Sequence, residues 1–156
     1  IIMFPAVAIF LAAVSVSNAC VPTATTTTTV PCCTMLSQSA LPRRAPSVTT
    51  YQQCSVLQRV SSTCPVDGIV VCDAAQETNP SSIILEFFNS AGTVVRTASL
   101  SGSPATSVTV KVVCQNGVWR VPQSTGSTTY FDIASVSCSQ TGSQGTDRGY
   151  VIGTAI

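Results

Sequence analysis

The sequence predicts an all-β protein, an immunoglobulin-like antiparallel β-sandwich stapled by disulfides. From Gly68 onward, short runs rich in Val, Ile and Thr recur at intervals of roughly 8 to 14 residues, separated by turn residues. Several runs alternate apolar and polar side chains, as strands with one buried face do. The even number of cysteines suits a disulfide framework. They are Cys20, Cys32, Cys33, Cys54, Cys64, Cys72, Cys114 and Cys138.

An apolar stretch at the start of the chain predicts a signal peptide over residues 1–19. Residues 1–16 carry no charge, and Ser17-Asn18-Ala19 is a small-x-small cleavage site. The run is short for a hydrocarbon core of ~30 Å and contains Pro5, which favours a leader over a membrane anchor. No basic residue precedes it, so the alternative is a buried strand or helix. A leader implies a secreted, extracellular protein in an oxidising setting.

Residues 20–31 predict a Thr-rich linker. The segment CVPTATTTTTVP has too little apolar surface to offset the entropy of ordering it. Threonines close to proline in a secreted protein are candidates for O-glycosylation, and an unmodified spacer is the alternative. The candidates are Thr23, Thr25, Thr26, Thr27, Thr28 and Thr29.

The disulfide-rich domain is predicted to span residues 32–138. Its first part, residues 32–51, shows neither a two-residue nor a 3.6-residue period, so its cysteines are needed to hold it in place. Residues 52–60 fit a short helix and a strand equally well. Residues 139–156 form a Gly/Ser-rich tail whose brief apolar end is a candidate edge-pairing strand.

Five strands and one shorter segment are predicted from residue 69 onward. The strands are 69–74, 83–89, 93–100, 108–114 and 129–138, and the shorter segment is 118–121. Asn116-Gly117 is the strongest hairpin signal, because both residue types accept the positive φ of a two-residue turn. In strand 108–114, Val108, Val110 and Val112 share one face with Cys114, which predicts that this face is core. Both faces of strand 83–89 are largely apolar, which predicts a central or doubly covered strand.

The cysteine pattern leaves the disulfide pairing open. Cys32 and Cys33 are predicted to have different partners, because a bridge between adjacent cysteines is strained. Zinc binding is disfavoured, since there is no C-x-x-C pair and the leader implies an oxidising compartment.

A set of motifs resembles the nematode six-cysteine domain. It comprises the Thr-rich stretch, the adjacent Cys32-Cys33, the run V-x-V-V-C-Q-N-G-V-W at 110–119 and the closing I-A-S-V-S-C at 133–138. The resemblance covers roughly residues 32–138 and implies an extracellular module of unknown function with no catalytic residue to carry over. This chain has eight cysteines rather than six, and Cys20 and one of Cys32/Cys33 are the expected additions.

The complement-control module is the nearest alternative family, because it shares the pattern C-x-N-G-x-W. That module expects its last cysteine shortly after the tryptophan. Here 18 residues separate Trp119 from Cys138, which disfavours this assignment.

The composition argues against an enzyme. The chain has no His, so triads of the Ser-His-Asp and Cys-His kinds are excluded, and its acidic residues form no calcium-type loop. No cofactor or metal site is predicted. Trp119, Tyr130 and Phe131 are a candidate binding patch for a glycan or peptide. The alternative is that Trp119 packs over a bridge in the core.

The functional prediction is a secreted structural or adhesive module that self-assembles through strand-edge pairing into a homo-oligomer or polymer. The alternative is a soluble recognition domain that binds a glycan or surface receptor in defence or signalling. Charged residues make up 8% of the chain and its net charge is +1. We therefore expect no strong electrostatic field that would attract nucleic acid or an anionic membrane. The expected partners are an extracellular protein or glycan and further copies of the chain, with no membrane span in the mature chain.

Overall fold

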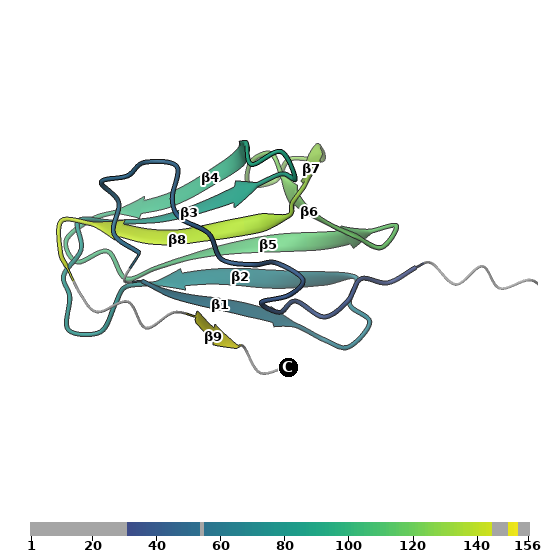
Figure 1. The fold of residues 1–156 in the computed structure, drawn as a ribbon, viewed down its shortest axis with the longest axis horizontal. Helices are drawn as coiled ribbons and strands as arrows, with labels where there is room; N and C mark the ends of the chain where they lie inside the picture. The colour runs from purple at the N-terminus through teal and green to yellow at the C-terminus, as the bar shows by residue number, and fades with distance from the viewer. Residues whose placement is uncertain (1–30, 54, 145–149, 153–156) are drawn as a thin grey trace, which may run out of the picture.

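The computed structural model describes residues 31–53, 55–144 and 150–152. None of these residues lies in a helix, and their strands form two stacked sheets (Figure 1). The strands are β1 (Val56–Ser61), β2 (Asp67–Asp73), β3 (Ser82–Phe88), β4 (Val94–Ser101), β5 (Ser107–Gln115), β6 (Val118–Pro122), β7 (Tyr130–Asp132), β8 (Ser135–Thr141) and β9 (Tyr150–Ile152).

The two sheets differ in size. The larger sheet has the order β7-β6-β5-β2-β1-β9, and the smaller sheet has the order β4-β3-β8. Neighbouring strands are antiparallel throughout, except that β9 runs parallel to β1. The predicted disulfide-stapled β-sandwich is therefore confirmed.

The alternating pattern of the sequence explains the core. Val108, Val110 and Val112 on β5 are buried, whereas Thr109 and Lys111 between them are exposed, as the period of two predicts. β3 lies between β4 and β8 and is buried continuously from Ile83 to Phe88, which confirms it as a central strand.

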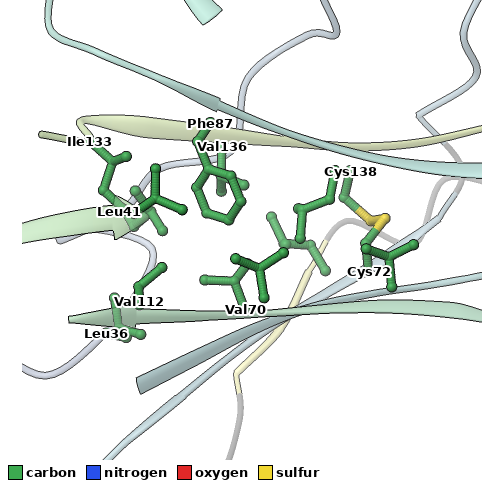
Figure 2. Packing of buried hydrophobic residues seen from close by; sticks show 14 of the residues in the cluster. Leu36, Leu41, Val70, Cys72, Phe87, Val112, Ile133, Val136 and Cys138 are labelled. Atoms are coloured by element: carbon green, nitrogen blue, oxygen red, sulfur yellow. A yellow bond between two sulfur atoms is a disulfide. The ribbon is translucent and has the colours of Figure 1, made fainter. Parts of the chain in front are cut away.

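The core lies between the facing sides of the sheets. Figure 2 shows Phe87 and Val136 of the smaller sheet facing Val70 and Val112 of the larger one. Burying each such side chain contributes about 1.5–3 kcal/mol.

The irregular segment after Cys33 also enters the core. Leu36 and Leu41 are almost completely buried, at 2% and 0% exposure; in Figure 2 Leu36 lies beside Val112 and Leu41 beside Ile133. The Leu36 N–H donates to Ser61 Oγ over 2.9 Å, and the buried Arg59 donates through Nε to the Leu41 carbonyl over 2.6 Å. These contacts fix a segment that has no strand of its own.

Two sequence-based expectations are corrected at the C-terminal side of the domain. The single strand predicted over 129–138 is two strands, because the chain changes sheets between them: Ile133 N–H donates to the Trp119 carbonyl and Ala134 N–H to the Phe88 carbonyl. β8 runs to Thr141, beyond the predicted domain end at residue 138, because it pairs with β3 as far as Ser82. Within the predicted tail, β9 pairs with β1.

Other expectations are met. Residues 52–60, which fitted a helix and a strand equally well, contain most of strand β1. Asn116 and Gly117 have φ values of 53° and 78° and connect β5 to β6, which confirms the predicted hairpin turn.

Three disulfides join the described residues. Cys72 on β2 is bonded to Cys138 on β8, with Cα atoms 5.4 Å apart, and this bridge links the two sheets as the inter-sheet bridge of immunoglobulin domains does. Cys33 is bonded to Cys114 at the end of β5, and Cys32 to Cys64 in the β1–β2 connection.

Cys32 and Cys33 thus have different partners, as predicted. Both are bridged, so neither is a spare thiol in this framework. Cys20 and Cys54 lie outside the described residues, as do the predicted signal peptide at 1–19, the candidate glycosylated threonines and nearly all of the predicted linker.

The two edges of the smaller sheet differ in whether another described segment is hydrogen-bonded to them. Residues 42–52, here called the covering segment, meet the outer edge of β8 near both of their ends and arch over the smaller sheet in between; they appear dark blue in Figure 1. Val136 N–H donates to the Pro42 carbonyl over 3.0 Å, and Gln52 and Gln140 exchange two backbone hydrogen bonds of 2.9 Å. At the opposite edge, β4 pairs with β3 and with no other described strand.

Side chains anchor the covering segment to the sheet. Glu86 on β3 is 3% exposed, and its carboxylate accepts hydrogen bonds from the Ser47 hydroxyl and from the Ser47 N–H, the latter over 2.9 Å. Arg43 donates to the Cys138 carbonyl over 3.0 Å and also to the Gln53 carbonyl. Arg44 lies over the Phe88 ring, 4.2 Å from its centroid, in a cation–π contact.

Candidate functional site

The three aromatic residues predicted as a binding patch do not share one exposed surface. Trp119 is 5% exposed and belongs to the core cluster. Its Nε1–H donates to the Thr34 carbonyl over 3.0 Å, and its cross-strand neighbour is Cys114 of the Cys33–Cys114 bridge. Trp119 therefore occupies the position that the alternative prediction gave it, beside a bridge in the core.

Tyr130 and Phe131 point in opposite directions because they are consecutive residues of β7. Phe131 is opposite the fully buried Val121 and packs against the core. Tyr130 is opposite Pro122 and lines a surface pocket. The predicted patch is corrected accordingly: Tyr130 lines the pocket, whereas Trp119 and Phe131 pack in or against the core.

This pocket, here called the basic pocket, forms where two neighbouring strands separate. β5 pairs with β2 over residues 107–113, but it pairs with β6 only over residues 113–115. Between Ser107 and Val112, β5 therefore has no described strand on the side away from β2. The connection between β6 and β7 and the side chain of Arg96 from the other sheet border the space that remains.

The hydrogen-bond pattern of β5 aims backbone groups into this space. Cys114 N–H donates to the Val66 carbonyl, and Ala74 N–H donates to the Thr106 carbonyl, so even-numbered residues of β5 face β2. In an antiparallel ladder the residues between them face the other way. The N–H and C=O groups of Thr109 and Lys111 are thus directed away from β2, toward the basic pocket.

The pocket has a volume of about 460 Å³, within the range of small-ligand sites. Its lining combines two cations, an aromatic ring, several hydroxyls and a few apolar groups. The lining residues are Arg96, Thr109, Val110, Lys111, Val113, Pro122, Thr125, Gly126, Ser127, Thr128 and Tyr130. No carboxylate is among them.

The two cations differ in how their charge is balanced. Lys111 Nζ lies 2.7 Å from Asp67 Oδ2, and this hydrogen bond, together with the charge of Asp67, raises the pKa of Lys111 above its ordinary value. Arg96 donates through Nη1 to the Pro122 carbonyl over 2.8 Å, a neutral partner. Among the described residues no carboxylate pairs with Arg96, and partial burial lowers the pKa of its guanidinium.

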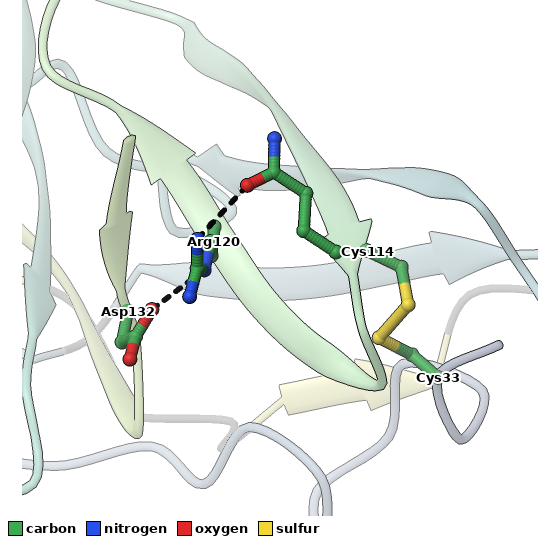
Figure 3. A network of polar contacts seen from close by, with 5 residues as sticks. Cys33, Cys114, Arg120 and Asp132 are labelled. Atoms are coloured by element: carbon green, nitrogen blue, oxygen red, sulfur yellow. Dashed lines mark hydrogen bonds and ion pairs between the residues drawn. A yellow bond between two sulfur atoms is a disulfide. The ribbon is translucent and has the colours of Figure 1, made fainter. Parts of the chain in front are cut away.

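Another cation, Arg120 on β6, has its charge balanced by a carboxylate. Arg120 lies between Gln115 and Asp132, with Nη1 3.0 Å from Gln115 Oε1 and Nε 2.7 Å from Asp132 Oδ1 (Figure 3). The uncompensated positive charge at the basic pocket therefore comes from Arg96.

Sequence reasoning did not find Arg96, Lys111 or the hydroxyls of residues 125–128 as site residues. One sequence feature could have indicated Arg96 as a site residue: it is the one charged residue of β4, whose other side chains are apolar or carry hydroxyls. A single charge in such a strand needs a polar partner or contact with solvent. The pairing of β5 with β6 ends at Val113, and no local sequence pattern indicates where it ends.

Within the described part of the chain, no group of three or more His, Cys, Asp or Glu side chains comes together as metal ligands. The same residues contain no helix that is long and apolar enough to cross a membrane.

No protein-family model matches the chain, and comparison with curated proteins and with solved structures gives no match either. The resemblance to the nematode six-cysteine domain therefore stays a prediction. Several disulfides in one small domain are typical of extracellular proteins.

Proposed function

We propose that this chain is a secreted structural or adhesive module that associates with further copies of itself through the edge of β4. The observation that carries the proposal is the contrast between the two edges of the smaller sheet. The covering segment occupies β8, whereas the eight residues of β4 have no described strand beyond them. A long uncovered edge is a template for pairing with another chain.

The ladder between β3 and β4 identifies the groups available for pairing. Gly102 N–H donates to the Ser81 carbonyl, so the residues of β4 that face β3 are Arg96, Ala98 and Leu100. The backbone groups of Thr97, Ser99 and Ser101 are turned outward.

The side chains on this edge favour a second copy as the occupant. Thr97, Ser99 and Ser101 are exposed and uncharged. Arg96 contacts the other sheet through Pro122 instead of projecting from the edge. Two β4 strands can therefore meet in antiparallel fashion without placing like charges opposite each other.

Sedimentation velocity of the oxidised full chain between about 10 μM and 1 mM tests this proposal. The wild-type protein is expected to associate as its concentration rises. Thr97→Pro removes an outward N–H without removing a bond to β3 and is expected to reduce association at least tenfold. Thr97→Val retains the N–H and is the matched control. A wild-type protein that stays monomeric at 1 mM, or equal association of Thr97→Pro in a folded state, would exclude edge pairing.

A second candidate function is recognition of an extracellular glycan or receptor. The basic pocket favours it, because it places the unpaired charge of Arg96 beside hydroxyls and the Tyr130 ring. A glycan array probed with the folded, oxidised protein tests this candidate. Binding to a defined set of glycans supports recognition, and no binding to any arrayed glycan counts against it.

A further inference from the structure

We propose that the basic pocket binds a saccharide that carries a carboxylate, with Arg96 as the residue that pairs with the carboxylate. This inference rests on the second candidate function and deepens it by naming the class of ligand.

Charge is the first argument for an acidic ligand. The Lys111 charge is balanced by Asp67, 2.7 Å from its Nζ, so it adds little net attraction for an anion. Arg96 has one neutral partner, the Pro122 carbonyl, and a guanidinium has five N–H donors. Arg96 lines a pocket whose walls include no carboxylate, and its donors beyond the one to Pro122 have no partner among the described residues. A ligand carboxylate would accept from these donors in the charge-assisted geometry that arginine favours.

The rest of the lining suits a compact polyhydroxylated molecule. Thr109, Thr125, Ser127 and Thr128 carry hydroxyls, each of which both donates and accepts a hydrogen bond. Tyr130 adds an amphipathic ring against which the apolar face of a sugar can pack.

The length of the open strand argues against an extended peptide as the ligand. Only Thr109 and Lys111 turn their backbone groups into the pocket, and the connection containing residues 125–128 bounds it. Strand addition depends on a row of main-chain hydrogen bonds together with sites for alternate side chains. Two residues are too few for that mode, whereas they can bind the hydroxyls of a single sugar ring.

The inference can be tested by NMR with the isotopically labelled, oxidised full chain. D-Glucuronic acid is the probe, and D-glucose is its neutral counterpart with the same ring. Glucuronate is expected to shift the amide signals of residues 125–128 and Tyr130 and the side-chain Nε–H signal of Arg96 in a saturable manner. Glucose is expected to bind at least tenfold more weakly. Equal binding of glucose, or equal shifts from acetate alone, would overturn the assignment to an acidic sugar.

Three variants localise the effect. Arg96→Gln removes the charge and is expected to weaken glucuronate binding at least tenfold, whereas Lys111→Gln is expected to change it less than threefold. If Arg96→Gln fails to fold, Thr109→Glu tests the same point, because it adds a competing carboxylate to the lining at an exposed position. Its expected effect is also a loss of binding. Unchanged binding in a folded Arg96→Gln or Thr109→Glu variant would overturn the proposal.

The outcomes distinguish failure of this inference from failure of the two candidate functions. Array binding to neutral glycans without any glucuronate binding would retain recognition and refute the acidic ligand. Binding of an acidic tetrapeptide in place of glucuronate would also refute it. Self-association through β4 is measured independently, by sedimentation of Thr97→Pro.

Discussion

Cys72 and Cys138 are both fully buried, and their disulfide joins the middle of the larger sheet to β8 of the smaller one. Their sequence separation is 66 residues. Figure 2 shows the bridge at one side of the packed aliphatic residues, so it adds a covalent tie without displacing the centre of the core. The Cys32–Cys64 bridge, in contrast, joins two exposed residues.

Removal of the Cys72–Cys138 bridge is expected to destabilise the fold more than removal of the Cys32–Cys64 bridge. Cys72→Ala with Cys138→Ala is expected to lower the free energy of unfolding by about 4 kcal/mol, because the unfolded chain regains the freedom of a long loop and the core loses two buried sulfurs. Urea denaturation monitored by circular dichroism measures the change. The matched control is Cys32→Ala with Cys64→Ala, for which a smaller loss is expected. A larger loss in the control would contradict the assigned role of the inter-sheet bridge.

A side chain in place of Gly68 on β2 is expected to destabilise the fold. A Cβ at this position would lie 2.6 Å from Leu36 Cδ1 and 2.8 Å from the Val60 carbonyl oxygen. Gly68→Ala is therefore expected to destabilise the fold by about 1–3 kcal/mol. Gly102→Ala is the control, since a Cβ there meets nothing within 4 Å, and its effect is expected to stay within about 0.5 kcal/mol. Thermal unfolding of both variants checks the pair, and equal midpoints would show that Leu36 does not pack over Gly68.

Trp119 is expected to act as a core residue in solution. Trp119→Ala is expected to cost about 3–5 kcal/mol, because it empties a large buried site and leaves the Thr34 carbonyl without its donor. Val118→Ala is the neighbouring control, as Val118 is 39% exposed, and a change below about 1 kcal/mol is expected for it. The fluorescence of the single tryptophan gives an independent measurement. Emission of the folded protein at the wavelength of the unfolded chain would place Trp119 in water and refute its burial.

The Lys111–Asp67 contact is expected to appear in the titration of the lysine. Asp67→Asn removes the hydrogen bond and the charge that raise the pKa of Lys111, so this pKa is expected to fall toward its ordinary value of 10.5. Because the folded-state pKa is the raised one, the stabilising effect of the pair is fully present below the pKa of an unfolded lysine. It is lost as pH rises through the folded-state pKa.

NMR of the Lys111 side-chain carbon next to Nζ follows this titration between pH 8 and about 12. Asp132→Asn is the control, since Asp132 pairs with Arg120 and its removal is expected to leave the Lys111 titration unchanged. Identical curves for wild type and Asp67→Asn would mean that the contact does not persist in solution.

Local sequence patterns predicted most of the strands because the alternation of side chains and the chemistry of turns are local properties. The face formed by Val108, Val110 and Val112 and the turn at Asn116-Gly117 are examples. The change of sheets at Ile133 and Ala134 could not be predicted in this way. It depends on carbonyl groups of Trp119 and Phe88, which are distant in sequence and belong to different sheets.

The candidate site was less predictable than the fold. The sequence predicts Tyr130 as a site residue, but Phe131 beside it packs against the core because consecutive residues on a strand face opposite sides. Arg96 joins the pocket because its side chain spans from one sheet to the Pro122 carbonyl of the other, a relationship that requires the packed sheets. The burial of Leu36 and Leu41 likewise depends on tertiary contacts rather than on periodicity.

The covering segment sets a limit on how far copies of this chain can add to one another. Among the described residues, β8 is occupied and the smaller sheet offers one long free edge, so two molecules that join through β4 leave no such described edge for a third. In the described part of the chain the larger sheet ends in β7 and β9, which have three residues each, and the open stretch of β5 is bordered by the connection between β6 and β7. Contact between identical edges is two-fold symmetric, and it closes on itself instead of propagating into a fibre. Strand pairing at this edge would thus produce discrete pairs, and a longer array would require a different surface.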